Sequence, residues 1–173
     1  EHLYDRTHKR VAAVKLVRFR DLVIHHEHQR EVDPKASGRC LAEAYRKGYF
    51  ELPLFNHELK QFISRVNLVV AAMPGLEFRP FDEAAVIDCL TRAFDGLTLA
   101  KEAQATPLRD AFLQALAKEQ RAWIDELAPT SIPWPDGRKL KLLYSEQGRD
   151  EDGQPISPEL QIKLHECFIL KAH

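Results

Sequence analysis

The sequence predicts a mainly α-helical protein with small β segments, an α+β fold. Between about residues 34 and 128, apolar residues recur at helical spacing in runs that open with residues typical of helix starts. The first 32 residues and the stretch 138–144 instead show the short apolar or alternating runs typical of strands. We therefore expect an N-terminal β-hairpin over 1–32, a compact five-helix bundle over 33–128, and a short β segment plus a helix over 129–173.

The N-terminal region is expected to form a hairpin with one long second strand. A short extended piece over 2–4 precedes a turn at 5–8, and the second strand runs over 11–24. That strand is too long to be straight, so we expect a bulge or bend near Arg20 and Asp21. Apolar residues between Val11 and Val17 occupy both pleat faces, and an isolated hairpin cannot bury both. The strand therefore needs partners elsewhere in the chain or upstream of it.

The helical region carries clear start and stop signals. The first helix is expected between Pro34 and Gly48, the second between Asn56 and Pro74-Gly75, and the third between Asp82 and Gly96. A short fourth helical piece is expected over 99–103. Thr106-Pro107 is expected to start a fifth helix, which ends at Leu127. Trp123 falls at core spacing on the fifth helix, so we expect it to be buried.

The C-terminal region begins with proline-rich sequence. Pro133 and Pro135 lack the amide hydrogen that a central strand needs, and Trp134 between them is either a surface platform or, as we favour, an apolar plug. A turn at 136–137, an alternating strand over 138–144, an acidic loop over 146–154 and a helix starting at Pro158 complete the expected order.

Composition limits the classes of function. The 173 residues carry a formal net charge of -1, so the net charge does not indicate a nucleic-acid-binding protein. No stretch is apolar for the roughly 18 residues that a membrane span requires. Cys40, Cys89 and Cys167 lie far apart, and we expect buried free thiols in a reducing compartment. We expect a cytoplasmic protein without a membrane partner, and a chain cut from a longer one.

Catalytic and cofactor motifs are missing from the sequence. The seven glycines form no phosphate-binding loop, so we expect no catalytic residue, no cofactor and no ATPase site within this chain. His25, His26 and His28 suggest a metal site, but no second ligand pair lies nearby in the sequence. We read them as ordinary histidines at a solvated strand end, and keep a metal-dependent hydrolase as a third hypothesis.

Two basic segments are the features most typical of binding. Residues 6–20 contain six basic residues and no acidic one, and Arg138–Lys141 contains three basic residues close to Tyr144. Such side chains suit phosphate contacts, and an aromatic ring can stack on an unpaired base. A charged, solvent-facing strand explains the same pattern. The candidate nucleic-acid-binding residues are Arg10, Lys15, Arg18, Arg20, Arg138, Lys139, Lys141 and Tyr144.

Three separate segments of the chain carry a recognisable residue pattern. The first is Leu127-Ala128-Pro129-Thr130 with Pro135-x-Gly137 and Tyr144, which follows the pattern L-A-P-T, then P-x-G and Y. The second is the run 158–168, and the third is Tyr4-Asp5 with Arg10-Val11 and Leu22-Val23-Ile24. Together these segments resemble the HrpB-type DEAH-box helicases, from which the chain departs in Trp134 and in its longer acidic loop.

The resemblance implies a C-terminal region of an ATP-dependent, RNA-directed helicase, truncated within its last segment. ATP and Mg would belong to upstream motor domains of the parent protein, and residues 1–32 would end an OB-like segment. We expect an accessory module that binds or guides single-stranded RNA or DNA. The alternative is a protein-interaction or packing module of the helicase that does not touch nucleic acid.

Overall fold

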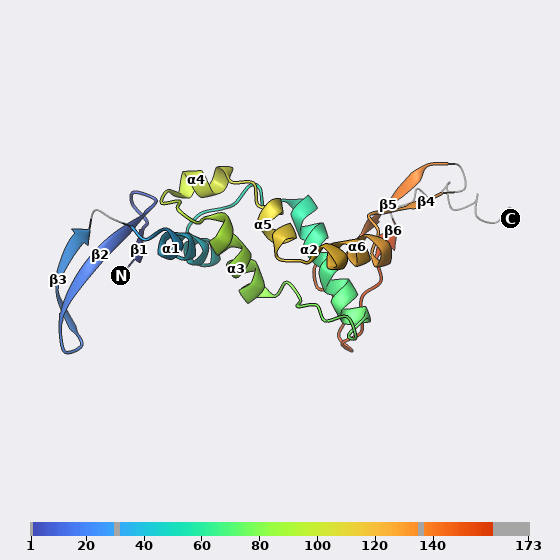
Figure 1. The fold of residues 1–173 in the computed structure, drawn as a ribbon, viewed down its shortest axis with the longest axis horizontal. Helices are drawn as coiled ribbons and strands as arrows, with labels where there is room; N and C mark the ends of the chain where they lie inside the picture. Colours follow the sequence, from blue (N-terminus) through green and yellow to red (C-terminus); the bar gives the residue numbers. More distant parts are fainter. Residues whose placement is uncertain (1, 30–31, 135–136, 161–173) are drawn as a thin grey trace. The chain divides into compact units, whose positions relative to one another are not determined.

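The computed structural model describes residues 2–29, 32–134 and 137–160, which form two compact units (Figure 1). Unit 1 comprises Glu1–Leu59 and Asp82–Ala115, and unit 2 comprises Lys60–Phe81 and Leu116–His173. The expected mainly α-helical, α+β fold is confirmed. Helices of the region 34–128 occur in both units.

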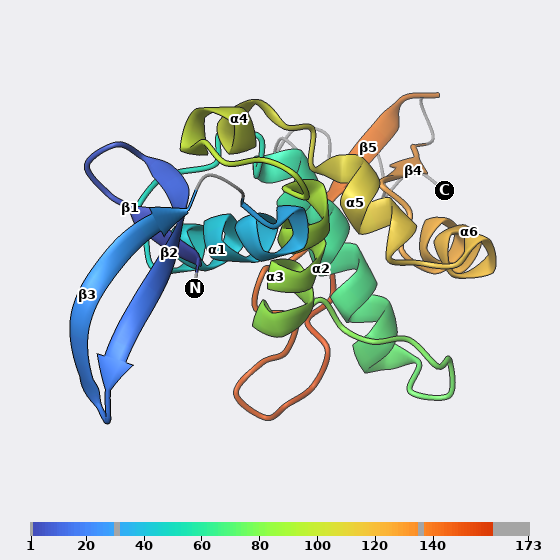
Figure 2. The same cartoon turned by 60° about the vertical axis from the view of Figure 1, so that its left-hand side comes forward.

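Unit 1 opens with a three-stranded antiparallel sheet. Its strands are β1 (His2–Asp5), β2 (Arg10–Phe19) and β3 (Leu22–Gln29), in the order β1-β2-β3. Figure 2 shows β2 and β3 as a long, curved ribbon. The single long strand expected over 11–24 is wrong: the chain reverses at Arg20, whose φ of 54° is left-handed, and a bulge lies between Val17 and Arg18. The expected bend is thus a complete turn.

Four helices lie wholly within unit 1, and one of them, α1, packs against β1 and β2. They are α1 (Pro34–Arg46), α3 (Glu83–Ala93), α4 (Ala100–Ala105) and α5 (Arg109–Gln114). Pro34 occupies the first turn of α1, and the Asp82 carboxylate caps α3 by accepting a hydrogen bond from the Ala85 amide at 2.8 Å. The largest fully buried side chains of this unit are Leu41, Leu90, Phe94, Leu108 and Phe112.

The contact between α1 and α3 requires a glycine. A Cβ built on Gly38 would lie 2.6 Å from the Thr91 carbonyl oxygen and 3.1 Å from backbone atoms of Phe94. Because backbone atoms cannot swing aside as a flexible side chain can, only glycine allows the two helices to approach this closely.

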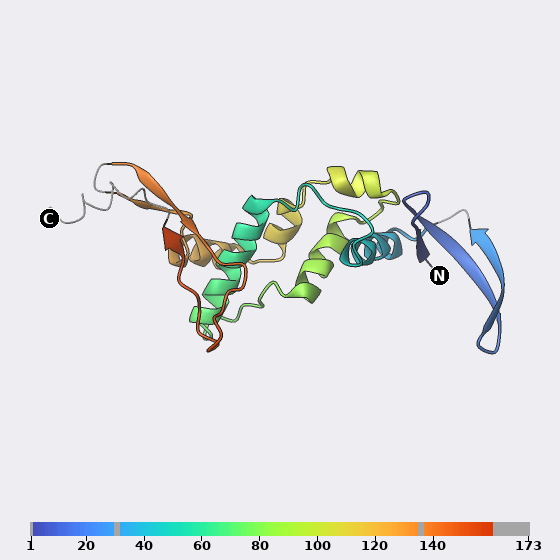
Figure 3. The same ribbon diagram turned by 180° about the vertical axis from the view of Figure 1, so that it is seen from behind.

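Unit 2 contains most of α2 (His57–Ala72), together with α6 (Lys118–Leu127) and the strands β4 (Ser131–Pro133), β5 (Lys139–Leu143) and β6 (Glu159–Leu160) (Figure 3). The Asn56 side chain accepts a hydrogen bond from the Leu59 amide and so caps α2 as expected. The strands pair antiparallel in the order β4-β5-β6. Pro133 therefore lies on an edge strand, where its missing amide hydrogen is tolerated.

Two predicted helices are wrong in detail. The fifth helix, expected from Thr106 to Leu127, is two helices, α5 and α6, so the described residues form six helices rather than five. Thr106 ends α4 by donating to the Glu102 carbonyl, and Ala117 takes an extended ψ of 159° that interrupts the chain. The helix expected from Pro158 is replaced at its start by β6, and residues 161–173 lie outside the described residues.

The two tryptophans differ in how far they are buried. Trp134 is buried, 7% exposed, which supports the expected plug, whereas Trp123 is 39% exposed and stacks on Phe78 at the surface. The prediction that Trp123 is core is therefore wrong.

Cys40 and Cys89 are free thiols, and Cys167 lies outside the described residues. Among the described helices, none combines the length and the apolar character of a membrane span.

Candidate nucleic-acid interface

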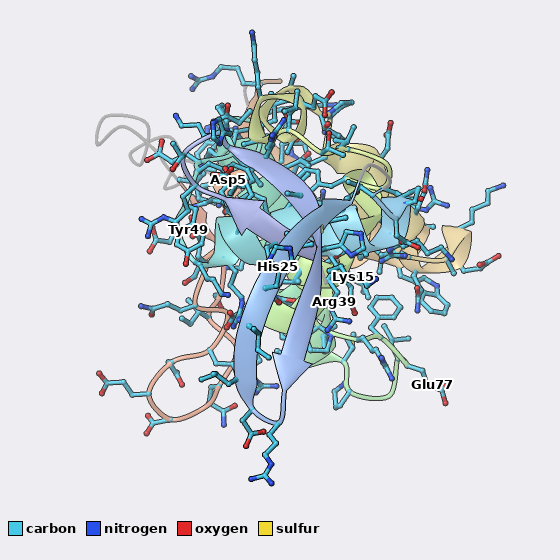
Figure 4. The ribbon with its side chains drawn as sticks, turned by 90° about the vertical axis from the view of Figure 1, so that its left-hand side faces the viewer. Asp5, Lys15, His25, Arg39, Tyr49 and Glu77 are labelled. Atoms are coloured by element: carbon cyan, nitrogen blue, oxygen red, sulfur yellow. The ribbon has the colours of Figure 1, made fainter. Side chains whose placement is uncertain are left out.

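Strand β2 and its flanking turns carry exposed basic side chains. Arg10, Lys15 and Arg20 are all exposed, and the side chain of Arg18 lies outside the description. Figure 4 shows Lys15 and His25 along the β2–β3 ribbon. None of these three exposed cations forms an ion pair with a described side chain.

The pleat of β2 divides these cations between two faces. Arg10 and Lys15 are an odd number of residues apart on a regular strand, so they project to opposite sides. Lys15 lies opposite Glu27 in the β2–β3 register, which places an acidic residue beside it. Arg10 and Lys15 therefore do not form one continuous row of cations. A phosphate backbone would have to pass along the strand edge or across the turn at Arg20.

The turn between β1 and β2 is held in place at several points. The Asp5 carboxylate accepts hydrogen bonds from the Thr7 and His8 amides and contacts His8 Nδ1 at 2.6 Å. The hydrogen bond with the His8 side chain is the main reason why the pKa of Asp5 lies below its usual value of 3.8. This turn positions Arg10 at the start of β2.

The end of the same turn is anchored to the start of α4. The Val11 amide donates to Thr98 O at 2.7 Å, and the Ala100 amide donates to Lys9 O at 2.9 Å. These two backbone bonds flank Arg10, so its backbone is fixed on both sides while its side chain remains exposed.

The second basic segment belongs to unit 2. Lys139 and Lys141 are exposed on one side of β5, while Leu140 on the other side is 9% exposed, as the alternation predicted. Arg138 is also exposed, just before the strand. The structure thus places Arg10, Lys15 and Arg18 on β2, with Arg20 in the turn that follows it. It places Lys139 and Lys141 on β5, just after Arg138, in the other unit.

Tyr144 is placed differently from an aromatic ring that stacks on a base. It is 4% exposed, and its hydroxyl donates to Pro129 O at 2.5 Å. The Gln61 side chain accepts from the Tyr144 amide and donates to its carbonyl oxygen. Burial raises the pKa of the Tyr144 phenol, because ionisation there is disfavoured. Tyr144 therefore contributes packing to unit 2, and we leave it out of the interface.

Arg65 completes a clamp around the same segment. This side chain is 8% exposed, and it donates to Ala128 O at 2.6 Å, Ile124 O at 3.4 Å and Asp125 Oδ1 at 2.6 Å. Its cation thus satisfies carbonyls at the C-terminal end of α6, where a positive charge is favourable. The sequence analysis missed Arg65, although a basic residue on the apolar face of α2 was a visible signal.

The Leu127–Thr130 motif and Tyr144 thus have a structural role, which is to hold the segment after α6 in place. Arg65 binds the carbonyl of Ala128, Tyr144 binds that of Pro129, and the Leu142 amide donates to that of Thr130. Three successive carbonyls after α6 are held in this way. We conclude that this motif fixes the passage from α6 into the small sheet.

The described histidines and cysteines do not cluster with carboxylates into a metal site. No group of three or more His, Cys, Asp or Glu side chains suited to a metal occurs among the described residues. His25 is exposed on β3, and the side chains of His26 and His28 lie outside the description.

Comparison with solved structures shows what the fold is similar to. Two crystal structures of Escherichia coli HrpB, described as a DExH-box NTPase and as a DEAH/RHA helicase, match with TM-scores of 0.67 and 0.68 at 13% and 14% identity. They cover 95% and 99% of this chain, which spans only 20% and 21% of those chains. The chain therefore has a fold similar to that of one part of these two structures. No curated protein matches the sequence.

A match to a protein family covers the C-terminal part of the sequence. The ATP-dependent helicase C-terminal family, HrpB_C, matches residues 89–173. This match, together with the likeness to the HrpB structures, confirms the predicted resemblance to the HrpB-type helicases.

Proposed function

We propose that the chain is an accessory module of an ATP-dependent RNA helicase and guides single-stranded nucleic acid to motor domains upstream in the parent protein. ATP and Mg would act in those motor domains, in the cytoplasm, and this module would supply no catalytic residue. The E. coli relatives are described as an NTPase and a helicase, and this chain spans about a fifth of their length. A module of this size can contribute binding energy without carrying out the chemistry.

The observation that carries the proposal is the cationic strand β2. Residues 6–20 contain no acidic residue, and Arg10, Lys15 and Arg20 project into solvent from a strand that is anchored to α4. Lys and Arg side chains bind a single strand by displacing its condensed counterions, which needs no sequence-specific contact. Lys139 and Lys141 on β5 are a second group of exposed cations that a longer strand would use.

Fluorescence anisotropy with a fluorescein-labelled 12-nucleotide oligouridylate tests this proposal. We expect the Kd to rise steeply between 50 and 200 mM salt, and the double variant Lys15→Ala/Arg20→Ala to lose about tenfold in affinity with a shallower salt dependence. Lys118→Ala/Arg121→Ala is the matched control, because it removes two exposed cations from α6 and gives the same net charge. Equal losses in both double variants, or no binding by the folded protein at 50 mM salt, would overturn the proposal.

A packing or protein-interaction role is the second candidate. The observation in its favour is the apolar start of β3, where Leu22 is 70% exposed and Ile24 is 62% exposed. Solvent-exposed aliphatic side chains two residues apart on a strand are typical of surfaces that contact other protein segments. The anisotropy experiment distinguishes this role from the first. If the module only packs against protein, oligouridylate does not bind it, or it binds the β2 double variant and the α6 control variant with equal affinity.

A further inference from the structure

An open groove of about 600 Å³ lies between β1 and α1 in unit 1. Its walls are His2, Leu3 and Tyr4 from β1, residues on one side of α1, and Tyr49. Successive strand residues point to opposite faces of a sheet, yet three consecutive residues of β1 line this groove. The edge of β1, rather than one of its faces, therefore borders the groove. β1 is indeed an outer strand in the order β1-β2-β3.

The hydrogen-bond pattern shows which backbone groups of β1 face outward. The Val11 amide donates to Thr98 O, away from β1, so the Tyr4–Val11 pair in the β1–β2 register is a non-hydrogen-bonded pair. The amide and carbonyl of Tyr4, and by the same alternation those of His2, then point out of the sheet. None of these outward groups has a backbone partner in the described part of the chain. Unpaired groups of this kind bind an added strand.

The α1 side of the groove offers small side chains and positive charge. Ala36, Cys40 and Ala44 leave room for an apolar side chain, and Arg39 and Lys47 are exposed, without an ion pair among the described residues. The one carboxylate in the lining, Glu43, is already paired with Arg46 at 2.8 Å. The unpaired charge along the groove is therefore positive.

The end of the groove is aromatic. Tyr4 stacks on Tyr49 with ring centroids 6.0 Å apart, and the Arg6 guanidinium lies 4.5 Å from the centre of the Tyr49 ring. The Tyr4 hydroxyl is inaccessible to solvent and has no hydrogen-bond partner among the described residues. A buried hydroxyl without a partner is costly, and its burial raises the pKa of Tyr4.

We propose that this groove binds an extended acidic peptide of a partner protein, which pairs with β1 as an added strand and places carboxylates near Arg39 and Lys47. The outward backbone groups favour a peptide over a nucleotide, because they match the donor and acceptor spacing of a strand. This surface is separate from the cations of β2. Peptide binding at the groove is therefore tested separately from nucleic-acid binding by β2.

The test uses two short peptides as probes, acetyl-EVEVEVE-amide and acetyl-KVKVKVK-amide, titrated into isotopically labelled protein and followed by amide chemical shifts. The acidic peptide should shift the amides of Leu3, Tyr4 and Cys40 in a saturable way, and the basic peptide should not. An acidic peptide with methylated backbone nitrogens should lose binding, because it cannot donate to β1. Equal binding of the methylated or the basic peptide would overturn the proposal.

Protein variants give a second, independent readout. Arg39→Glu/Lys47→Glu should weaken binding of the acidic peptide at least tenfold. The matched control Lys35→Glu/Lys101→Glu reverses two exposed lysines outside the groove lining, gives the same net charge, and should leave the affinity within twofold. Displacement of the acidic peptide by heptauridylate, with the same amides shifting, would mean that the groove is a nucleotide site and would also overturn the proposal.

Discussion

At the scale of single residues, Arg65 is the one charged side chain that is buried among the described residues. Its guanidinium replaces water with two backbone carbonyls and one carboxylate, so the cost of burying the charge is offset by hydrogen bonds. Asp125 contributes less than the carbonyls, because its side chain is 78% exposed and solvent screens the pair.

Arg65→Met tests this assignment. Methionine fills a similar volume but leaves the carbonyls of Ala128 and Ile124 without their donor, so we expect unit 2 to lose about 2–4 kcal/mol of unfolding free energy. Both tryptophans lie in unit 2, so urea unfolding followed by tryptophan fluorescence reports the change. Asp125→Asn should cost less than about 1 kcal/mol. Similar losses in the two variants would show that the ion pair, and not the carbonyl clamp, carries the stability.

Asp5 makes the β1–β2 turn sensitive to acid. The folded pKa of this carboxyl is lowered, mainly by the His8 side chain, so its contribution is present above the unfolded value and is lost as pH falls through the folded pKa. We expect the Asp5 carboxyl carbon to titrate below 3.8 in NMR spectra, with the amides of Thr7 and His8 moving together with it. In Asp5→Asn that concerted step should vanish. Titration of Asp5 at or above 3.8 would contradict this account.

Residue types alone predicted some of these roles and missed others. The exposure of Arg10, Lys15 and Lys139 follows from charge and strand position, which a sequence displays directly. The burial of Tyr144 depends on Gln61, which lies 83 residues earlier in the chain. The exposure of Trp123 depends on the segment around Phe78. Such long-range partners leave no local trace in the sequence.

At the scale of elements, the helix pair α1–α3 depends on one position. Gly38→Ala forces a methyl group against the Thr91 carbonyl, so we expect a loss of roughly 1–3 kcal/mol, measured by urea unfolding with far-UV circular dichroism. Gly75→Ala is the matched control, because a Cβ there meets nothing within 4 Å, and it should change stability by less than about 0.5 kcal/mol. An unchanged stability of Gly38→Ala would mean that the helices separate without cost.

The helices whose starts were predicted best from the sequence are those with a capping residue or a proline at the start. Asn56 and Asp82 cap α2 and α3, and Pro34 opens α1, because each signal acts within one helical turn. The break between α5 and α6 has no glycine or proline at its centre. There, Gln120 caps α6 by accepting from the Ala117 amide, and it also donates to Glu77 O from a distant segment. The interruption thus rests partly on a tertiary contact.

At the scale of the whole molecule, the net charge of -1 conceals an uneven distribution. Acidic residues gather in the loop 146–154, while β2 and its turns are basic. Within unit 2, Glu146 of that loop pairs with Lys60 at 3.3 Å. The bulk charge therefore does not exclude nucleic-acid binding, and the location of the cations is the better guide.

The most direct test of nucleic-acid guidance by β2 is an amide chemical-shift map with a 12-nucleotide oligouridylate. The account predicts shifts centred on residues 10–20 that fade as salt is raised from 50 to 200 mM, since each phosphate contact adds to the salt dependence. Shifts confined to Lys139–Leu143, or a spectrum of the folded protein that does not change at 50 mM salt, would contradict it.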